Sequence, residues 1–313
     1  MTRKRPTAHP TNRPTVYLGI DAGGSHTEAV VTDANGSVLS RVRGGPGAVT
    51  LDNISRTSKT IAGVARDAAR EAGATLPAAA LVVGAAGAGR QLVRTALERA
   101  LKALKLARRT RVTTDGEIAL AGAFTAGPGI VVISGTGSVA YGRDAAGTIR
   151  RAGGLGWQLG DEGGGYALGR MALAAVGRAL DGRGIRTTLS EELLHATGAA
   201  DLDALVAWAQ TADRAAVAAL ARPASAAAER GDPIARQLVD ATSADLVALV
   251  IGLLRQFPSG APDQVALAGS LLGSGTPVRM SLVTSIGRVA PQLRVQAQAP
   301  DPTLGAARLA SQA

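Results

Sequence analysis

The sequence predicts an α/β protein with two lobes. At 313 residues the chain is long for a single hydrophobic core, and this length favours about two domains. Three short strand-like runs open the chain and are followed by a helix, a strand and a helix. A second set of three strand-like runs begins near residue 130, and in both sets a glycine-rich turn follows the first strand. This repetition suggests a duplicated framework, with residues 15–115 as the N-terminal lobe and 116–302 as the C-terminal lobe.

The N-terminal lobe begins with apolar runs of β type. They predict strands over residues 16–21, 27–33 and 38–43, and the pair Asn35-Gly36 marks a hairpin between the second and the third. Apolar residues at helical spacing predict a helix over 52–72. A buried strand, a helix and a further strand are expected over 80–85, 90–106 and 111–114.

The C-terminal lobe repeats this opening before it becomes mainly helical. Strands are expected over residues 130–134, 139–143 and 148–151, followed by helices from about 163 to 257 and a strand over 264–268. The last segment predicts a short helix over 303–310. We expect this C-terminal segment, residues 303–313, to pack back on the N-terminal lobe.

The composition argues against nucleic acid as a partner. Aromatic residues make up only 2% of the chain, which leaves few side chains on which bases could stack. The net charge is +10, but Arg3, Lys4, Arg5 and Arg13 all lie in residues 1–14, a segment that we expect to be a disordered basic arm. Most of the other arginines are spread over helix-like stretches, as on a solvated surface.

The absence of cysteine excludes several kinds of chemistry. A chain without cysteine has no disulfide, no thiolate nucleophile, no Cys-ligated zinc and no ordinary iron–sulfur cluster. The three histidines are dispersed, so a histidine metal site is not expected. The N-terminus has no apolar leader, and the longest apolar run, near residues 246–254, is too short to span a bilayer. We therefore expect a cytoplasmic protein without a membrane partner.

Two glycine-rich turns are candidate phosphate sites. Glycine tolerates positive φ and has no Cβ, so consecutive backbone N–H groups can converge on an anion. Taken singly, each turn is more typical of a plain hairpin. The occurrence of two such turns, one of them preceded by an acid, favours two lobes that bind one phosphate chain. The expected ATP-binding residues in them are Gly23, Gly24, Ser25, Gly135, Thr136, Gly137 and Ser138.

Two aspartates follow or end predicted strands beside these turns. Asp21 could hold Mg²⁺ through water, because magnesium prefers one or two carboxylates together with phosphate oxygens; the alternative is an acid that bonds the next backbone amides. Asp115 lies between a strand and a helix, a position typical both of helix N-caps and of catalytic acids. The pattern does not separate these two roles.

Residues 151–166 form a glycine-rich loop that also contains Trp157 and Tyr166. Glycine at this density lets backbone approach a ligand, and Asp161 could bond a substrate hydroxyl or help to order magnesium. The start of the following helix could face anionic phosphate. A flexible linker is the alternative, although linkers seldom carry large apolar side chains among their glycines. Gly269 and Ser270 follow a late strand and could seat an adenine ring, or form an ordinary loop.

In this order, the motifs resemble the superfamily of sugar kinases, Hsp70 and actin, and within it the BadF/BadG/BcrA/BcrD ATPase family. The N-acetylglucosamine kinases of that family are the most similar. The likeness extends from about residue 16 to residue 307, and its most specific part is the glycine-rich loop with Gly160-Asp161-Glu162-Gly163. It implies a two-lobed ribonuclease H-like fold of the actin, hexokinase and Hsp70 type, with a nucleotide cleft between the lobes.

The resemblance also implies roles for single residues. Asp115 falls where these kinases keep the carboxylate that activates the 6-hydroxyl of the sugar, and Gly154, Leu155, Gly156 and Asp161 fall on substrate-contacting positions. The phosphate and adenosine segments fall on the two turns and on Gly269-Ser270. These kinases usually place a sugar-binding asparagine after the third strand. Here Ala48 stands at that position, and Asn53 could substitute only if the loop is shifted.

We therefore expect an ATP- and Mg²⁺-dependent kinase of a small amino sugar, N-acetylglucosamine at the 6-hydroxyl, with Asp115 as general base. Glucosamine, N-acetylmuramic acid or another sugar are alternative acceptors, and a non-catalytic sugar- or nucleotide-binding regulator is the alternative function. The family's activators of 2-hydroxyacyl-CoA dehydratases transfer electrons through a Cys-ligated cluster, which a chain without cysteine cannot hold. A homodimer is also expected.

Overall fold

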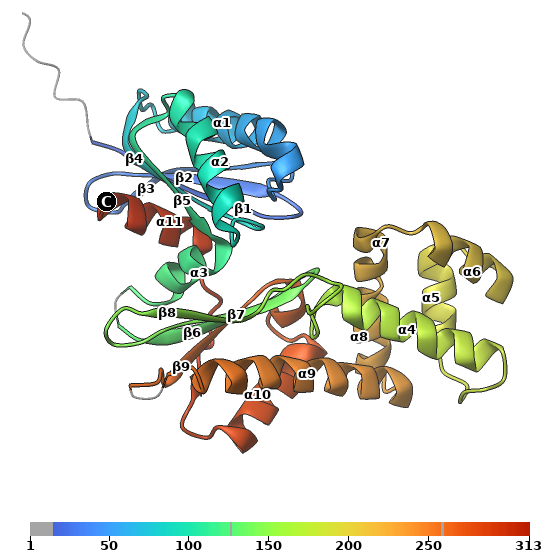
Figure 1. Ribbon diagram of the computed structural model, residues 1–313. Coiled ribbons are helices and arrows are strands. Elements are labelled where there is room, and N and C mark those ends of the chain that lie inside the picture. The colour runs from blue at the N-terminus through green and yellow to red at the C-terminus, as the bar shows by residue number, and fades with distance from the viewer. Residues whose placement is uncertain (1–14, 126, 258–259) are drawn as a thin grey trace, which may run out of the picture. The chain divides into compact units, whose positions relative to one another are not determined.

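The fold contains two mixed β-sheets with helices, and it is seen in a computed structural model that describes residues 15–125, 127–257 and 260–313 (Figure 1). The basic arm expected at 1–14 lies outside the described residues. Contacts divide the chain into two units: unit 1 comprises the described residues up to Asp115 together with Ala306–Ala313, and unit 2 comprises Gly116–Gly305.

Unit 1 contains a five-stranded sheet in the order β3-β2-β1-β4-β5. β1, β2 and β3 are antiparallel neighbours, whereas β4 and β5 run parallel to β1. The helices α1 and α2 pack together on one face, and α11 lies on the side away from them. The strands are β1 (Tyr17–Ala22), β2 (Thr27–Thr32), β3 (Val38–Gly44), β4 (Ala78–Ala85) and β5 (Ala107–Thr114), and the helices are η1 (Leu51–Asn53), α1 (Ile54–Glu71), α2 (Gln91–Ala103) and α11 (Pro302–Ser311).

Unit 2 repeats this topology in the order β10-β9-β6-β7-β8. Again the first three strands are antiparallel neighbours and the last two run parallel to the first. Its strands are β6 (Gly129–Ser134), β7 (Ser138–Arg143), β8 (Ile149–Gly153), β9 (Gln264–Ala268) and β10 (Arg294–Val295). Its helices are α3 (Asp115–Ala123), α4 (Gly165–Leu180), α5 (Leu189–Thr197), α6 (Leu202–Thr211), α7 (Arg214–Ala219), α8 (Ala221–Glu229), α9 (Pro233–Leu254), η2 (Ser270–Leu272) and α10 (Pro277–Val289).

The second hairpin of each unit is closed by the same local device. In unit 1 the carboxylate of Asp33 accepts from the N–H groups of Asn35 and Ser37, and Gly36 has φ +83°. In unit 2 the carboxylate of Asp144 accepts from Thr148 N–H at 2.8 Å, and Gly147 also has φ +83°. An aspartate that bonds following amides, with glycine in the left-handed region three residues later, is a stable hairpin turn. The two units therefore share their turn chemistry as well as their strand order.

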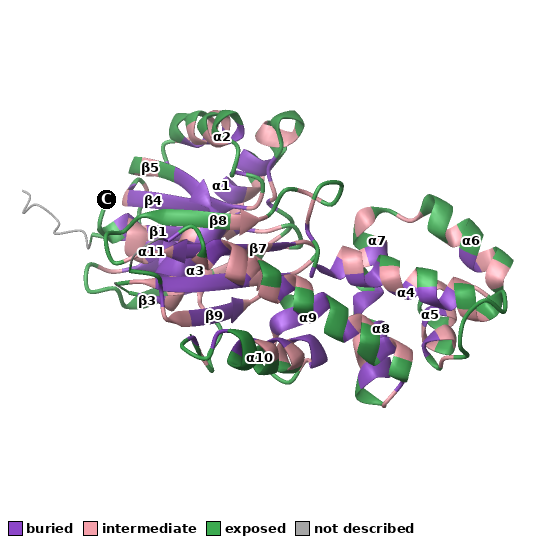
Figure 2. Cartoon of the chain, turned by 60° about the horizontal axis from the view of Figure 1, so that its bottom comes forward, coloured by how far each residue is buried: buried purple, intermediate pink, exposed green. Residues whose placement is uncertain are grey.

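Each face of the unit 2 sheet has its own core. Alternate residues of a strand point to opposite faces, so Ile130 and Val132 pack with the large helical cluster, while Val131 packs with Leu120 and Phe124 of the α3 segment. Figure 2 shows the central strands largely buried, the edge strand β8 exposed, and the helices buried along one side. The core is filled mainly by Ala, Val, Leu and Ile, as the low aromatic content requires.

Helix α9 is longer than the apolar run that the sequence analysis considered too short to span a bilayer. The apolar run near 246–254 is the last part of a 22-residue helix, which by length and composition alone could cross a membrane. Its buried residues, among them Leu246, Val250 and Leu253, belong to the core of unit 2. Helix α9 packs against α8, α10 and β7, as a core helix does.

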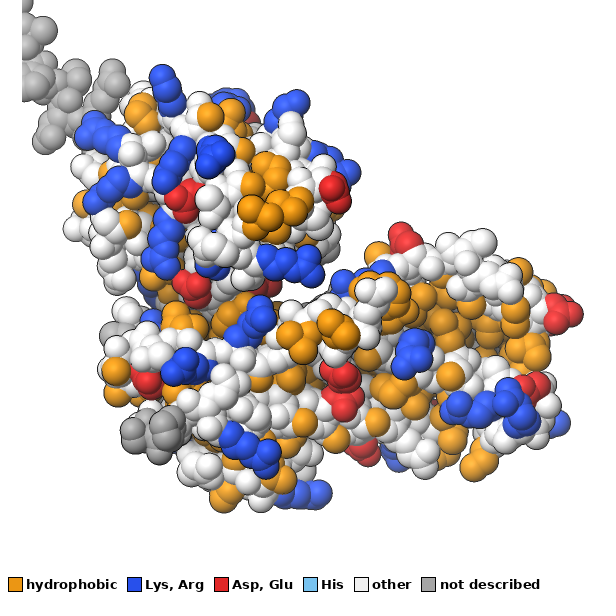
Figure 3. Space-filling view, in the orientation of Figure 1, with side chains coloured by type: hydrophobic (Ala, Val, Ile, Leu, Met, Phe, Trp, Pro, Cys, Tyr) orange, Lys and Arg blue, Asp and Glu red, His pale blue; other side chains and the backbone are white. Residues whose placement is uncertain are grey.

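Positive charge is spread over the surface of the described residues. Three exposed arginines lie on β5 at the edge of the first sheet: Arg108, Arg109 and Arg111. Figure 3 shows Lys and Arg side chains scattered over the visible face, with Asp and Glu among them. No continuous basic stripe is seen on that face.

Asp232 joins the start of α9 to the start of α5. Its carboxylate accepts from Ala235 N–H and from the hydroxyl groups of Thr187 and Thr188, as well as from Thr188 N–H. Burial by itself would raise the pKa of Asp232, but these hydrogen bonds outweigh it and lower the pKa to about 2 from its ordinary 3.8. The ionised carboxylate is therefore part of the folded structure of unit 2.

We predict that Asp232→Asn destabilises the protein by about 2 kcal/mol at neutral pH. Because the folded pKa lies below the unfolded one, this contribution is present above about pH 4 and is lost as the pH falls towards 2. Urea unfolding of both proteins at pH 7 and across this acidic range measures it. A difference that did not shrink with falling pH would show that the ionised form is not what stabilises the fold.

Candidate functional site

The first glycine turn (residues 21–25) is held from within unit 1. Gly23 N–H donates to the carbonyl of His26 at 2.9 Å, and Gly23 O accepts from Gly47 N–H at 2.9 Å. Gly24 and Ser25 are exposed, and a Cβ on Gly24 would meet no atom within 4 Å. Neither Gly23 nor Gly24 has positive φ, so the turn does not use the left-handed conformation that glycine tolerates. The backbone of Gly24 is therefore accessible from solvent.

Asp21 and Asp115 lie at the same edge of the unit 1 sheet. Asp21 pairs with Gly84 of β4, which in turn pairs with Thr113 of β5, and Asp115 follows β5 directly. The carboxyl ends of these three parallel strands therefore coincide, and β1 and β5 are two strand spacings apart, about 10 Å. This edge is where parallel sheets of α/β proteins bind ligands.

Asp115 is the first residue of α3, and the packing of the next residue fixes where that helix begins. A Cβ on Gly116 would lie 2.5 Å from Cγ of the Tyr141 ring, a distance at which atoms overlap. Only glycine therefore lets α3 start directly against β7. Asp115 itself is partly buried. The sequence left open whether it is a cap or a catalytic acid; the structure places it as the first residue of α3, at the sheet edge.

In unit 2 the second glycine turn (residues 135–138) is bound to the glycine-rich loop (residues 151–166). Gly165 N–H donates to Gly135 O at 2.7 Å, and Tyr166 N–H donates to Thr136 O at 3.0 Å. Gly154 N–H donates to Ser138 O at 3.0 Å, and the Ser138 hydroxyl donates to the carbonyl of Glu162. The loop is therefore an ordered part of the unit, and the linker alternative is wrong.

These bonds correct the expected role of the helix that follows the loop. Helix α4 begins at Gly165, and its first two N–H groups, those of Gly165 and Tyr166, bond carbonyls of the second turn. They stabilise the turn and are not free to bind phosphate.

Asp161 is the most constrained residue of the loop. It has φ +65°, a left-handed conformation that non-glycine residues seldom adopt, and it is 7% exposed. Its Oδ2 accepts from Arg214 Nη2 at 2.6 Å. A Cβ on Gly137 would lie 2.6 Å from the Asp161 Cγ and 3.0 Å from Arg214 Nη2. The carboxylate and the guanidinium therefore lie directly against the second turn.

Arg214, the first residue of α7, was not predicted as a site residue. It stands 53 positions from Asp161 in a stretch that reads as an ordinary helix, so no local pattern reveals the pair. Its Nε is buried and has no hydrogen-bond partner among the described residues. Asp161 was predicted to contact substrate, and in this structure its carboxylate is bonded to Arg214.

The expected adenosine segment lies beside the second turn. Gly269 has φ +92°, and a Cβ there would lie 2.5 Å from the backbone carbon of Ser134, the residue before Gly135. Ile133 pairs with Ala268 in the parallel strands β6 and β9, so the two strands end at the same level. Three segments far apart in the sequence thus meet at one edge of the unit 2 sheet: residues 135–138, the glycine-rich loop and Gly269-Ser270.

The loop exposes apolar side chains near the expected substrate positions. Leu155, Trp157 and Leu159 are 55%, 48% and 79% exposed, and the Trp157 ring meets that of Tyr166 edge to face with centroids 5.5 Å apart. Gly154 is also exposed. Burial raises the pKa of nearby Asp245, and the negative charge of Glu162 raises it further. The loop therefore exposes an apolar surface beside these carboxylates.

The described residues include no group of three or more His, Cys, Asp or Glu side chains placed to hold a metal ion. Asp21, the predicted magnesium ligand, supplies a single partly buried carboxylate beside the first turn. One carboxylate suits a magnesium ion that takes its other ligands from water and phosphate.

Asn53 is engaged in the loop that follows β3. Its Nδ2 donates to Ala48 O at 3.1 Å, and its Oδ1 accepts from Thr50 N–H at 2.8 Å and from the Thr57 hydroxyl. The amide therefore braces residues 48–53.

We predict that Gly137→Ala destabilises the protein by about 1–3 kcal/mol, because its Cβ would overlap the Asp161 carboxyl group. Gly135→Ala is the matched control, since a Cβ there would meet no atom within 4 Å and its φ is not positive. Thermal and urea unfolding of the two variants measure the difference. Equal stability of the two would mean that the contact between Gly137 and Asp161 does not constrain the turn.

Comparison with known proteins identifies the family. The model of the BadF/BadG/BcrA/BcrD ATPase family matches residues 18–310. The chain is 30% identical over 232 residues to N-acetylmuramic acid/N-acetylglucosamine kinase of Clostridium acetobutylicum, covering 73% of this chain and 76% of that one. N-acetyl-D-glucosamine kinase of Dictyostelium discoideum is 28% identical, with coverage of 94% and 97%.

A solved structure agrees with this result. A candidate N-acetylglucosamine kinase from Chromobacterium violaceum superposes with a TM-score of 0.79 at 30% identity, covering 95% of this chain and 99% of that one. A glucokinase of the ROK family from Streptomyces griseus, at 18% identity and a TM-score of 0.61, shares the actin-like sugar kinase fold. The family model spans nearly all of the described residues. The protein is therefore a member of the BadF/BadG/BcrA/BcrD ATPase family.

Proposed function

We propose that this protein is an ATP-dependent sugar kinase that phosphorylates an amino sugar, N-acetylglucosamine at its 6-hydroxyl, with Asp115 as general base. Membership of an ATPase family supports the use of ATP. The relatives are named as kinases of N-acetylglucosamine, N-acetylmuramic acid and glucosamine, which supports an amino sugar as acceptor.

One observation in the structure supports the nucleotide site most directly. The second glycine turn, the glycine-rich loop and Gly269-Ser270 meet at one edge of the unit 2 sheet. Exposed Thr136 and Gly269 present backbone and hydroxyl groups there, and none of the bonds between turn and loop depends on a ligand. A site already organised in this way binds phosphate without first having to order its own backbone.

Unit 1 supplies the two carboxylates that the reaction requires. Asp21 beside the first turn would hold magnesium through water, and when bound this ion neutralises charge on the phosphates. Asp115, which follows β5 two strands away on the same sheet edge, would accept the proton of the sugar hydroxyl while that oxygen attacks the γ-phosphorus. The bond between the γ-phosphorus and the bridging oxygen then breaks, and ADP leaves.

The test is ADP release over a panel of hexoses, hexosamines and cell-wall sugars. We expect release to depend on an amino sugar and the product to carry phosphate at O6, which NMR of the product establishes. Asp115→Asn should lower turnover by about 10²–10⁴-fold while nucleotide binding is retained, because only proton transfer is lost. Near-normal turnover of this variant would remove Asp115 from the role of base.

Asp21→Asn tests the magnesium role. We expect a higher magnesium concentration for half-maximal rate, because the amide lacks the negative charge that attracts the hydrated ion. Asp33→Asn is the control, since Asp33 is a carboxylate of the same unit that closes a hairpin away from the first turn. An unchanged magnesium requirement in Asp21→Asn would argue that the metal is held elsewhere.

A further inference from the structure

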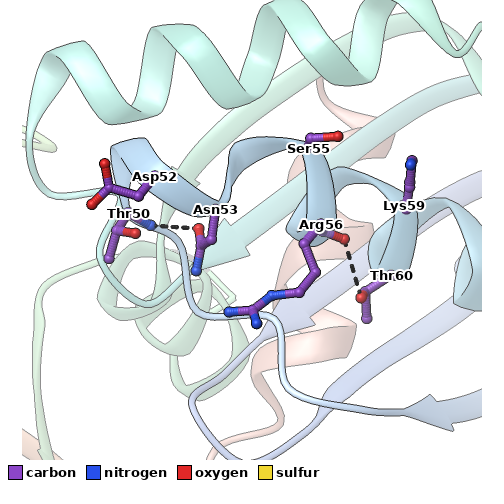
Figure 4. A pocket seen from close by; sticks show the side chains of 7 residues that line it. All are labelled: Thr50, Asp52, Asn53, Ser55, Arg56, Lys59 and Thr60. Carbon is purple, nitrogen blue, oxygen red and sulfur yellow. Dashed lines mark hydrogen bonds between the residues drawn. The ribbon is translucent and has the colours of Figure 1, made fainter.

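Unit 1 contains two adjoining cavities beside the first glycine turn. One, of about 410 Å³, is lined by Gly24 of that turn, by Ala48 and by residues at the start of α1. The other, of about 720 Å³, is lined by polar residues of α1 and of the segment before it, among them Asp52 and Lys59, and is drawn in Figure 4. Asn53, Arg56 and Thr60 line both cavities. The two cavities thus adjoin at Arg56, and the smaller one reaches Gly24, in the turn where the phosphates of a nucleotide are expected.

The wall of the smaller cavity is rigid. Gly47 N–H donates to Gly23 O at 2.9 Å, and Val49 N–H donates to Ala86 O at 2.8 Å. A Cβ on Gly47 would lie 3.0 Å from that of Ala22, so this loop lies directly against β1. The loop therefore holds the cavity open beside the turn.

Most polar groups of this wall are already used. Ala48 O accepts from Asn53 and from the hydroxyl of Thr57, and the Asn53 carbonyl accepts from Thr50. The Thr60 hydroxyl donates to Arg56 O at 3.3 Å. Ala48 itself offers only a methyl group. A neutral ligand would therefore find few free hydrogen-bonding groups on this side.

The Arg56 guanidinium is the exception. Within the described ranges, no carboxylate lies at ion-pair distance from it, although other arginines of the unit, such as Arg41 and Arg43, pair with Glu28. Figure 4 shows the Arg56 side chain pointing to the same side of α1 as that of Asn53, while Lys59 points away. Guanidinium groups bind carboxylates through two parallel hydrogen bonds, which gives such a contact both strength and direction.

We propose that Arg56 recognises a carboxylate on the sugar acceptor, so that this kinase accepts an acidic amino sugar as well as its neutral counterpart. The inference rests on the proposed function, because it takes the ligand beside the first turn to be the phosphate acceptor. The cavities are large enough for a sugar substituent, and the positive charge stands at their junction. The nucleotide phosphates are the other possible anion, and the test separates the two.

The test compares N-acetylmuramic acid, which carries a carboxylate, with N-acetylglucosamine, which does not. For Arg56→Gln we expect KM for the acidic sugar to rise at least about 10-fold, as loss of a charged hydrogen-bonding pair does. KM for the neutral sugar and KM for ATP should stay within about 2-fold. Arg66→Gln is the matched control: it removes the same charge from the same helix, at an exposed residue that lines neither cavity, and should leave all three constants unchanged.

Three outcomes would overturn the inference. An equal rise of KM for both sugars would show that Arg56 does not read the carboxylate, and a rise of KM for ATP alone would assign it to the nucleotide phosphates. Turnover of the neutral sugar with none of the acidic one would refute the inference and leave the proposed function standing.

If the wild-type protein phosphorylated neither sugar, the proposed function would fail. Calorimetric titration with N-acetylmuramic acid would still test whether Arg56 binds its carboxylate. Carboxylate-dependent binding of N-acetylmuramic acid that Arg56→Gln abolishes would support the recognition. Absence of such binding would refute it. Because Arg56 is exposed, we expect both variants to unfold at the wild-type temperature.

Discussion

The close contact between the second glycine turn and the glycine-rich loop is the constraint on which the candidate nucleotide site depends. Gly137 leaves no room for a Cβ because the Asp161 carboxyl group lies against it, and Asp161 is held there by Arg214 in a left-handed conformation. The bonds from Gly165 and Tyr166 then tie α4 to the same turn. Strain at Asp161 is tolerated because the surrounding contacts fix it, as is common at functional sites.

The same topology serves different chemistry in the two units. Both sheets have one strand order, and both close their second hairpin with an aspartate and a left-handed glycine. In unit 1 the strand ends carry acids, Asp21 and Asp115. In unit 2 the corresponding edge carries glycine backbone, and Ser134 bonds Gly163 O at 2.6 Å. The repeated framework thus carries carboxylates at the strand ends of one unit and glycine backbone at the strand ends of the other.

The sequence predicted the elements well because their signals are local. The pair Asn35-Gly36 forms the hairpin expected of it, and the strand over 264–268 has the expected bounds. Contacts between distant residues leave no such signal. The pair of Asp161 and Arg214 joins segments 53 positions apart, and the role of Asn53 depends on the fold of its loop. The two-residue strand β10 is too short for any periodicity to appear.

The choice of ligand beside the first turn depends on which polar groups of the loop after β3 are already hydrogen-bonded within the protein. The side-chain amide of Asn53 is hydrogen-bonded to Ala48 and Thr50 of its own loop. These bonds stabilise the loop and leave the amide fewer hydrogen bonds to offer a ligand. A ligand on that side is then recognised by a side chain that has no ion pair within the described residues. Of the polar side chains lining the smaller cavity, Arg56 alone carries a charge. A charge discriminates between an acidic and a neutral sugar more strongly than one neutral hydrogen bond does, because an ionic partner strengthens the bond about twofold. Charge at Arg56 therefore offers a route to acceptor choice that does not require a sugar-binding asparagine at position 48.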